Sequence, residues 1–494
     1  MASPEGRSSG PGAARRSAAR LRNQVVRTVA ERRRRGTYGP GFEDQLDAHG
    51  RAMVAARAGP GGHRDLPGAT RSDPAWRRLL RRGQRVRATG VGSDRPVAVL
   101  FVVQRYGSEV TGGAELACRE FATRLAARGH RVEVLTSRAQ SAHDWADVYP
   151  AGTSVVDGVT VHRLGVPAPR DNGAFESLTV KALWSGALVP PAEQQAWREL
   201  QGPDLPDLLP WLLRRAGDFD VAVHFSYLYT PTWAGLPVSS TLTSTVLHAT
   251  AHDEPAFWLP VFDDLFPLPN RYAWFSPEER DLLVRRGAPR DGAVIGIGVD
   301  LDVRGQASRF RSTIRLGERP YIVFVGRVEA GKGSEELIQF FEAYKARHPE
   351  PLALVFVGPA EDRRSHPDII YTGYVDDQTR TDAIAGAVGL VQPSFFESFS
   401  LVVTEAWAQQ RPVLVQGHTD VLVGQVKRSG GGLFYRGFAE FEASLELLVA
   451  RADAADTMGR AGRDFVAREY RWDVVLDRYE QLLRKAVAAA RSAG

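Results

Sequence analysis

The chain of 494 residues is 43% hydrophobic, has a formal net charge of +5 and contains a single cysteine, Cys118. This length allows two or three domains, each with its own core. No stretch approaches the roughly 18 consecutive apolar residues of a membrane span, and the first residues lack the apolar core of a signal peptide, so we expect a cytoplasmic protein. The lone cysteine excludes an internal disulfide. Its helical spacing with Phe121 and Leu125 predicts that it is buried.

The positive charge is concentrated at the start of the chain. Residues 1–95 hold 21 Arg, no Lys and 8 acidic residues, a net charge of +13, whereas the other 399 residues have a net charge of −8. Because the Gly, Pro, Ser, Ala and Arg content of residues 1–95 offers little apolar surface, we expect a mostly disordered leader. Residues 20–35 and 76–87 nevertheless have the pattern of amphipathic helices. Peripheral contact with an anionic membrane and a solvated tail are both open alternatives; nucleic acid is not an expected partner.

From Pro96 onward, short β-branched runs alternate with helical patterns. Strands are predicted at residues 97–103, 131–137, 159–164, 220–228, 244–249 and 293–298, and again at 321–326, 352–358, 369–375, 389–394 and 411–417. This alternation is typical of an α/β fold with parallel sheets that are covered by helices. We therefore predict two Rossmann-like domains at residues 96–300 and 321–470, a linker at 301–320 and a C-terminal helix at 471–494.

Ligands of open parallel sheets bind beyond the carboxyl ends of the strands. After the first predicted strand, Gly112 and Gly113 open a helix. Glycine lets the backbone approach a ligand closely, and the free amides of a helix start favour an anion. A glycine-rich turn without a ligand explains the same pattern, so this signal alone is weak.

The segment VFVGRVEAGKGSEELIQFF, residues 323–341, resembles the phosphate loop of an NTPase. That loop needs Ser or Thr after the lysine, whereas Gly333 follows Lys332 here. The segment lies between a predicted strand and a helix, so Arg327 and Lys332 should overhang the strand end. Two cations aimed at a diphosphate would ease its departure as a leaving group. Solvated surface cations are the alternative explanation.

The most specific pattern is PSFFESFSLVVTEAWAQQRPVLV, residues 393–415. Glu397 and Glu405 bracket the expected start of a helix. If the residues between them were mostly helical, the carboxylates would be up to about 12 Å apart along the axis, too far to share a proton or a metal ion. They could instead hold two groups on either side of a diphosphate. The backbone amides expected to face the phosphates are those near Phe399, Ser400 and Leu401.

In combination these motifs resemble those of retaining nucleotide-sugar glycosyltransferases of family 4, which have the GT-B fold. Residues 393–415 resemble the Glu-x7-Glu motif of that family, and GRVEAGKG resembles its Arg-x4-Lys diphosphate clamp. The similarity extends over about residues 97–485 and includes GGAE, IGIGVD and YTGYVDD. It implies two Rossmann-like domains whose parallel sheets face each other across a cleft, with the C-terminal helix crossing back to the N-terminal domain.

The resemblance also implies roles for individual residues. It places Glu397 against hydroxyls of the donor sugar and Glu405 against the ribose. Arg327 and Lys332 would then clamp the diphosphate. The same resemblance places Tyr374 and Val375 beside the base. One departure from the family pattern is Ser400, where many members have glycine.

The first domain should supply a histidine near the reacting carbon, and the segment STVLHATAHDEPAFW offers two. His248 ends a predicted strand and is our expected active-site histidine, with His252 as the alternative. His248 could also be an ordinary core residue. A metal site built from both histidines, Asp253 and Glu254 would suit a helix, which Pro255 and the preceding β pattern disfavour.

The sequence therefore predicts an enzyme that moves a hexose from a nucleotide diphosphate sugar to a hydroxyl of a glycan, glycolipid or metabolite. We expect retention of the anomeric configuration, no metal ion and no cofactor besides the sugar nucleotide as co-substrate. Two alternatives stay open. One is a noncatalytic GT-B scaffold that the basic leader recruits to a membrane. The other is a P-loop-like ATPase, although that class needs a hydroxyl after Lys332 and an acid at the end of a later strand.

Overall fold

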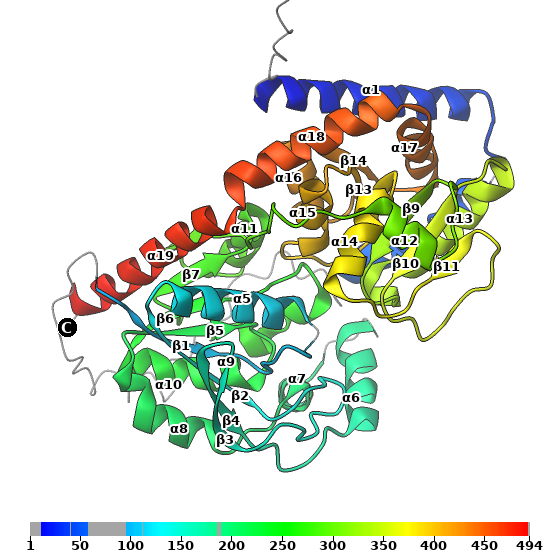
Figure 1. Cartoon of the computed structure of the whole chain (residues 1–494). Coiled ribbons are helices and arrows are strands. Elements are labelled where there is room, and N and C mark those ends of the chain that lie inside the picture. Colours follow the sequence, from blue (N-terminus) through cyan, green and yellow to red (C-terminus); the bar gives the residue numbers. More distant parts are fainter. Residues whose placement is uncertain (1–10, 40, 58–94, 111, 185–188, 493–494) are drawn as a thin grey trace, which may run out of the picture. The chain divides into compact units, whose positions relative to one another are not determined.

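A computed structural model describes residues 11–39, 41–57, 95–110, 112–184 and 189–492. The chain divides into two compact units. Unit 1 comprises Met1–Val54 and Ile297–Val474, and unit 2 comprises Ala55–Gly296 and Val475–Gly494. Each unit contains one sheet (Figure 1). The amphipathic pattern of residues 76–87 lies outside the described residues.

Unit 2 contains an eight-stranded sheet in the order β3-β4-β2-β1-β5-β6-β7-β8. All neighbouring strands are parallel except β3, which pairs with β4 in the antiparallel direction. The bounds are β1 (Ala98–Val102), β2 (Arg131–Ser137), β3 (Gly152–Val156), β4 (Val159–Leu164), β5 (Val221–Phe225), β6 (Ser244–His248), β7 (Arg271–Trp274) and β8 (Gly292–Val294). The six strands predicted for this region are present, although β8 ends at Val294 and residues 295–298 of its predicted range are not in a strand. The sequence patterns miss β3, which is an almost fully exposed edge strand, and the four-residue β7.

The helices of unit 2 connect these strands. They are α5 (Gly113–Ala127), α6 (Asn172–Thr179), α7 (Pro191–Gln201), α8 (Leu208–Arg215), α9 (Thr230–Trp233), α10 (Gly235–Leu242), α11 (Pro277–Arg285) and most of α19 (Trp472–Ser492), with shorter turns η2 (Val180–Trp184), η3 (Ala216–Asp218), η4 (Pro255–Trp258) and η5 (Pro260–Phe262). Cys118 on α5 is fully buried, as predicted. The ring of Tyr479 on α19 packs 4.4 Å from that of Phe121, and the hydroxyl of Ser244 donates to the carbonyl of Ala486 at 2.7 Å. The last helix is thus part of the core of unit 2.

Unit 1 contains a six-stranded, all-parallel sheet in the order β11-β10-β9-β12-β13-β14. The strands are β9 (Tyr321–Val325), β10 (Ala353–Val357), β11 (Ile369–Tyr371), β12 (Gly389–Gln392), β13 (Val413–Gln416) and β14 (Gly432–Tyr435). The helices after the leader are α12 (Ala307–Thr313), α13 (Ser334–Arg347), α14 (Asp377–Gly386), α15 (Leu401–Ala408), α16 (Asp420–Ser429), α17 (Phe438–Ala450) and α18 (Ala452–Glu469), with the turn η6 (Ala330–Lys332). The five predicted strands are present, and β14 is an additional one. These two sheets, each with helices, confirm the predicted α/β class.

The predicted linker is more ordered than its composition indicates. Residues 307–313 form α12, whose Phe310 is buried. The guanidinium of Arg309 pairs with the buried carboxylate of Asp382 on α14. This part of the predicted linker is therefore helical, because the buried ring of Phe310 and the ion pair of Arg309 with Asp382 hold α12 in place.

The expectation of a mostly disordered leader is corrected for its described part. Residues 11–57 contain the helices α1 (Pro11–Arg34), α2 (Phe42–Leu46) and α3 (Ala48–Arg57). Val25 and Val29 of α1 are 4% exposed and belong to the hydrophobic core of unit 1. Figure 1 shows α1 running alongside α18. Val25 and Val29 of the predicted amphipathic helix at residues 20–35 are thus covered by protein, whereas Val26 is 51% exposed and the outer side carries arginines together with other polar residues.

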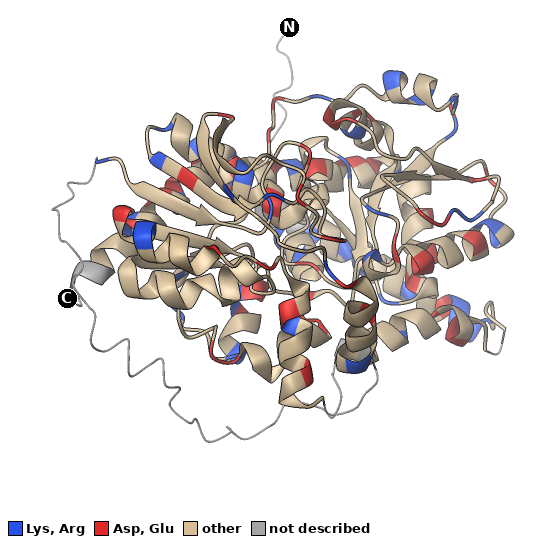
Figure 2. Cartoon of the chain, turned by 90° about the horizontal axis from the view of Figure 1, so that it is seen from below, with Lys and Arg blue, Asp and Glu red and all other residues tan. Residues whose placement is uncertain are grey.

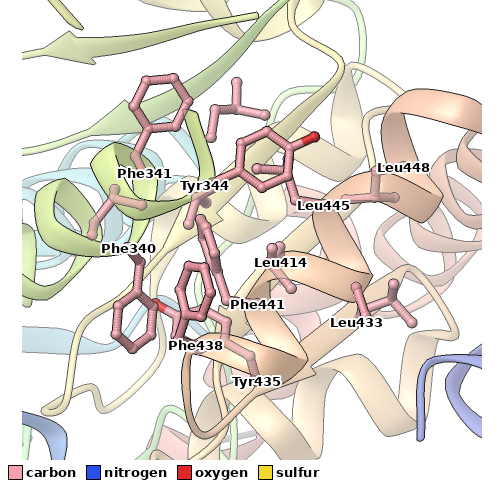
Figure 3. Packing of buried hydrophobic residues seen from close by; sticks show 14 of the residues in the cluster. Phe340, Phe341, Tyr344, Leu414, Leu433, Tyr435, Phe438, Phe441, Leu445 and Leu448 are labelled. Carbon is pink, nitrogen blue, oxygen red and sulfur yellow. The ribbon is translucent and has the colours of Figure 1, made fainter. Parts of the chain in front are cut away.

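The core of unit 1 is rich in aromatic side chains. Figure 3 shows Phe340, Phe438 and Phe441 pointing toward one another between α13 and α17, and their ring centroids are 5.5–5.7 Å apart in the pairs with Phe340. Acidic and basic residues are interspersed along the helices and loops (Figure 2). Among the described helices, none combines the length and the apolar content that a bilayer crossing requires.

Candidate functional site

The predicted donor-binding residues of unit 1 all follow the carboxyl ends of strands. Arg327 and Lys332 come after β9, and Tyr374 and Val375 come after β11. Glu397 lies in the loop of residues 393–400 after β12, which we call the acid loop. Because β9 and β12 are neighbours in the sheet, their following loops start side by side.

The backbone explains why glycine follows Lys332. Gly333 has φ +72°, a left-handed conformation that side chains rarely adopt, and a Cβ atom there would lie 2.2 Å from the carbonyl oxygen of Pro393. A serine or threonine at this position would therefore clash with the acid loop. The close approach excludes the hydroxyl that a phosphate-loop NTPase needs for its magnesium ion, so the ATPase alternative is disfavoured.

This close approach brings Lys332 and Glu397 together. The Lys332 Nζ atom lies 3.0 Å from Oε1 of Glu397, and the two side chains are 34% and 10% exposed. Glu397 does not lie on α15, which begins four residues later at Leu401, so the residues between the two acids are only partly helical. The Lys332 ammonium is the more exposed partner of this pair, so a negatively charged ligand can approach it from solvent.

Gln392, which sequence reasoning missed, organises the acid loop. Its side-chain Nε2 donates to Oε1 of Glu397 at 3.1 Å and to the hydroxyl of Ser400 at 2.9 Å. Ser400 has φ +70°, a strained conformation for a residue with a side chain. This explains why glycine would be the unstrained choice here. The hydrogen bond from Gln392 compensates for part of the strain.

The start of α15 is open. The structure records no side-chain cap for this helix within its described surroundings, and Phe399 and Ser400 are buried beside it. The first amides of a helix have no partner inside the helix, and they carry the positive end of its dipole. This end of α15 can therefore receive negative charge.

Glu405 lies on α15 and is largely buried. Its Oε1 accepts a hydrogen bond from Arg380 of α14 at 3.1 Å. Its Oε2 is buried and has no hydrogen-bond partner among the described residues. Burial raises the pKa of the carboxyl, although Arg380 opposes the shift. A buried acceptor without a partner is suited to a ligand hydroxyl.

Three of the predicted residues are less restrained. The side chain of Arg327 is 67% exposed and lies 3.2 Å from the carboxylate of Glu329. Tyr374 is 76% exposed, the highest value among the exposed large apolar residues, and Val375 is half-buried. The structure thus joins Lys332 to Glu397 directly and Ser400 to Glu397 through Gln392. It leaves Arg327 and Tyr374 as accessible side chains on the loops after β9 and β11.

The expected catalytic role of His248 is not supported by its position. The residue is fully buried at the end of β6, where its ring stacks 4.4 Å from Phe225 and 4.8 Å from Phe275. Its Nε2 lies 3.0 Å from the hydroxyl of Tyr479. Burial lowers the pKa of the imidazole to about 3, so it stays neutral. His248 is a core residue, because this end of β6 is enclosed by aromatic rings.

His252, the alternative, lies in the loop after β6. Its side chain is 31% exposed, and its Nδ1 is 3.5 Å from the carboxylate of Glu254. The preceding Thr250 has φ +51°, a strained conformation of the kind that clusters at functional sites. The accessible histidine in this segment is therefore His252.

A buried carboxylate holds this loop. Glu279 is 1% exposed and accepts hydrogen bonds from the backbone of Ala251 at 2.9 Å and of Phe275 at 2.6 Å. Its own amide donates to the hydroxyl of Ser276 at 3.1 Å, which caps α11. Burial raises the pKa of Glu279 to about 7. Glu279 thus joins the start of α11 to the segment that carries His252.

The glycines after β1 have a structural explanation. A Cβ atom on Gly112 would lie 2.2 Å from the carboxylate of Glu115, which is buried and paired with Arg105 at 2.6 Å. The first turn of α5 thus already contains an acidic side chain, Glu115. Gly113 has open space around its Cα.

One group of described residues has the spacing of metal ligands, namely His348, Glu442 and Glu446. Glu442 already accepts hydrogen bonds from Arg32 at 2.8 Å and from Arg347 at 2.6 Å. A metal ion would have to displace these two guanidinium groups, so we assign none. The alternative metal site at His248 and His252 is also disfavoured, because the ring of His248 is enclosed in the aromatic core.

Comparisons with known proteins agree with this arrangement. Residues 319–440 match the family model described as Glycosyl transferases group 1. This part of unit 1 is therefore similar to a glycosyltransferase group 1 domain. Its matched residues include the loops after β9, β11 and β12, and so the predicted donor-binding residues of unit 1. This confirms the resemblance that the motifs indicated.

Individual relatives extend the similarity over both units. The D-inositol 3-phosphate glycosyltransferase of Saccharomonospora viridis is 26% identical over 434 residues, which span 80% of this chain and 95% of the relative. The sucrose-phosphate synthase of Thermosynechococcus elongatus superposes with a TM-score of 0.61 at 19% identity, over 80% of this chain and all of that one. The Anabaena protein HepE, in complex with UDP and glucose, has a TM-score of 0.59 at 14% identity, over 79% of this chain and 100% of its own. The fold is therefore GT-B, and glycosyltransferase activity is supported over the noncatalytic and ATPase alternatives.

Proposed function

We propose that this glycosyltransferase moves a hexose from a nucleotide diphosphate sugar to an acceptor hydroxyl with retention of configuration. The observation that carries the proposal is the ion pair between Lys332 and Glu397, which lies beside the open start of α15. The Lys332 ammonium can bind the negatively charged diphosphate of a sugar nucleotide, and the Glu397 carboxylate can accept hydrogen bonds from the hydroxyls of its sugar. The complex of HepE with UDP and glucose supports this donor class.

The donor would exchange the ion pair for two new sets of contacts. The diphosphate takes the Lys332 ammonium, with Arg327 and the first amides of α15 as further donors. Glu397 is then free to accept hydrogen bonds from sugar hydroxyls. The buried Oε2 of Glu405 accepts a ribose hydroxyl, while Tyr374 and Val375 lie beside the base.

The chemical step follows from this arrangement. The bond between the anomeric carbon and the diphosphate oxygen breaks, and the cations stabilise the charge that develops on the leaving group. The acceptor oxygen forms the new bond on the same face of the sugar, and its proton passes to a diphosphate oxygen. Metal ions have no required place in this scheme because Lys332, Arg327 and the helix start supply the positive charge. His252 replaces His248 as the histidine that orients the donor sugar.

The test uses the purified full-length chain with UDP-glucose, UDP-N-acetylglucosamine and GDP-mannose, each with and without EDTA. We expect release of the nucleoside diphosphate from one of these donors, at a rate that EDTA does not change. Adding D-inositol 3-phosphate and other polyols tests acceptors, since one relative carries that name. NMR of the product anomer tests retention.

Absence of donor cleavage together with absence of UDP or GDP binding by calorimetry would overturn the proposal. Hydrolysis of ATP that needs magnesium and is lost in Lys332→Ala would support the ATPase instead. The scaffold alternative predicts that Glu397→Ala leaves the cellular function of the chain intact.

A further inference from the structure

The described leader, residues 11–39 and 41–57, has specific partners throughout unit 1. Arg22 of α1 stacks over the ring of Phe434 at 3.8 Å. Arg32 and the hydroxyl of Tyr38 donate to Oε2 of Glu442 at 2.8 Å and 2.6 Å. Glu442 is fully buried, and its other oxygen accepts from Arg347 and His348. Two of these four hydrogen bonds to the buried carboxylate thus come from the leader.

The leader also completes α17. The residue before this helix is Gly437, which has no side chain to cap the first amides. Asp47 of the leader accepts a hydrogen bond from the Phe438 amide at 2.8 Å, and a Cβ on Gly437 would lie 2.4 Å from its carboxylate. The leader therefore supplies the missing cap at the place where glycine leaves room for it.

The last described helix of the leader, α3, lies against the base of the acid loop. The ring of His49 packs edge-on against Phe395 at 6.0 Å. Gly50 is buried, and a Cβ there would lie 2.7 Å from Oε2 of Glu336 and 3.7 Å from the ring of Phe395. Phe395 is fully buried and precedes Glu397 by two residues.

Hydrogen bonds carry this contact into the acid loop. The hydroxyl of Ser394 donates to the carbonyl of Phe396 at 3.1 Å, and Thr419 donates to the carbonyl of Ser394 at 2.7 Å. On the other side of Gly50, Glu336 accepts from Gln416 at 2.6 Å. The acid loop is therefore fixed on one side by the strands of unit 1 and on the other by α3.

We propose that the leader positions the acid loop: α3, seated on Phe395 and Glu336, holds the segment that carries Glu397 in its place. The proposal rests on the proposed function for the role of Glu397, but the mechanical part does not depend on it. His49 and Gly50 are then positioning residues that act through Phe395. Phe395 cannot shift into the space that α3 fills, so the carboxylate stays within reach of Lys332.

The test compares Gly50→Leu with Ala52→Leu in the full-length chain. Both add the same side chain to α3, but Gly50 faces Glu336 and Phe395 whereas Ala52 is exposed. Hydrogen exchange of the amides of residues 393–401 is measured without any ligand. We expect at least tenfold faster exchange in Gly50→Leu and less than a twofold change in Ala52→Leu.

A milder pair of variants covers the case in which Gly50→Leu fails to fold. His49→Ala removes the ring that packs on Phe395, and His49→Phe restores an aromatic ring. Burial lowers the pKa of His49, so a neutral ring is the appropriate substitute. We expect His49→Ala to speed exchange in residues 393–401 and to lower kcat/KM for the donor tenfold, and His49→Phe to reverse both effects.

Unchanged exchange of residues 393–401 in both Gly50→Leu and His49→Ala would overturn the proposal, even if activity fell. Faster exchange in a protein that binds no nucleoside diphosphate would instead support the positioning contact and reject the donor site. The two failures are therefore distinguishable.

Discussion

The ends of strand β12 in unit 1 and strand β6 in unit 2 place a polar side chain in different surroundings. Both strands are parallel, fully buried and end in a polar residue. Gln392 at the end of β12 reaches forward and holds Glu397 and Ser400, whereas the ring of His248 at the end of β6 is stacked among aromatic rings. A polar residue at the end of a strand lies at the carboxyl end of the sheet, but the packing around it decides whether its side chain is accessible.

The largest expected effect is on catalysis and comes from Glu397→Gln. The change removes the charge that we place against the sugar hydroxyls, so kcat/KM should fall by about 10²–10³. Glutamine keeps the shape of the side chain and an oxygen that can accept from Gln392, so the thermal midpoint should stay close to that of the native chain. The measurement is donor cleavage beside a melting curve. Glu318→Gln, an exposed acid before β9, is the matched control and should change neither.

The next largest effects are expected from replacing the two histidines of unit 2, His248 and His252. His248→Ala opens a cavity in an aromatic core and should lower the free energy of unfolding by about 3 kcal/mol, with unchanged kcat per folded molecule. His252→Ala should leave stability unchanged and lower kcat by about 10-fold to 100-fold. Urea unfolding and steady-state kinetics on both variants distinguish a structural role from a catalytic one. The reverse pattern, with His248→Ala stable and inactive, would return the catalytic role to His248.

Glu279→Gln gives a pH-dependent effect on stability. The native carboxyl has a pKa of about 7, above the value of roughly 4.3 in an unfolded chain. The folded state therefore binds more protons between these values, and its stability is full below pH 4.3 and is lost as pH rises through 7. From pH 5 to pH 8 the native chain should lose roughly 3 kcal/mol relative to the variant, which does not titrate.

Urea titrations of both proteins at pH 5 and pH 8 measure this difference. Parallel pH profiles for the two proteins would show that Glu279 does not titrate in this range. Ser276→Ala, which removes the cap of the same helix without a titrating group, serves as control. It should lower stability by about 1 kcal/mol at both pH values.

Ser400→Gly should have the smallest effect. Glycine relieves the strain of φ +70°, which costs about 1–3 kcal/mol, but the change also removes the hydroxyl that Gln392 contacts, at about 1 kcal/mol. The net change in stability should stay within about 1–2 kcal/mol, and activity should remain of the same order. A large loss of donor binding would instead assign the hydroxyl a direct contact with the phosphates.

Much of the fold could be predicted because the strands are short, fully buried runs such as Tyr321–Val325 that alternate with helical patterns. The predictions failed where a segment is stabilised by partners far away in the sequence. Helix α1 is an example: its composition indicates disorder, yet Val25 and Val29 are buried against α17 and α18. An exposed edge strand such as β3 has no apolar pattern to detect.

The site was predicted in part for the same reason. Glu397 and Lys332 stand out because their motifs need charges at fixed spacing after a strand. Gln392 and Arg380 lacked such a signal, since an amide at a strand end and an arginine on a helix are common. Both were found only through the carboxylates that they contact.

The amino-acid pattern alone predicts the two α/β halves, the charged loops after the strands, and the family that those loops resemble. Local periodicity and chain spacing carry that information. Contacts in the folded chain show that Gly333 must be glycine, that His248 is a core residue and that the described leader residues up to Val54 belong to unit 1. Each of these depends on an atom from a distant segment: the carbonyl of Pro393, the ring of Phe225 and the carboxylate of Glu442. Contacts of that kind leave no periodic trace in the sequence.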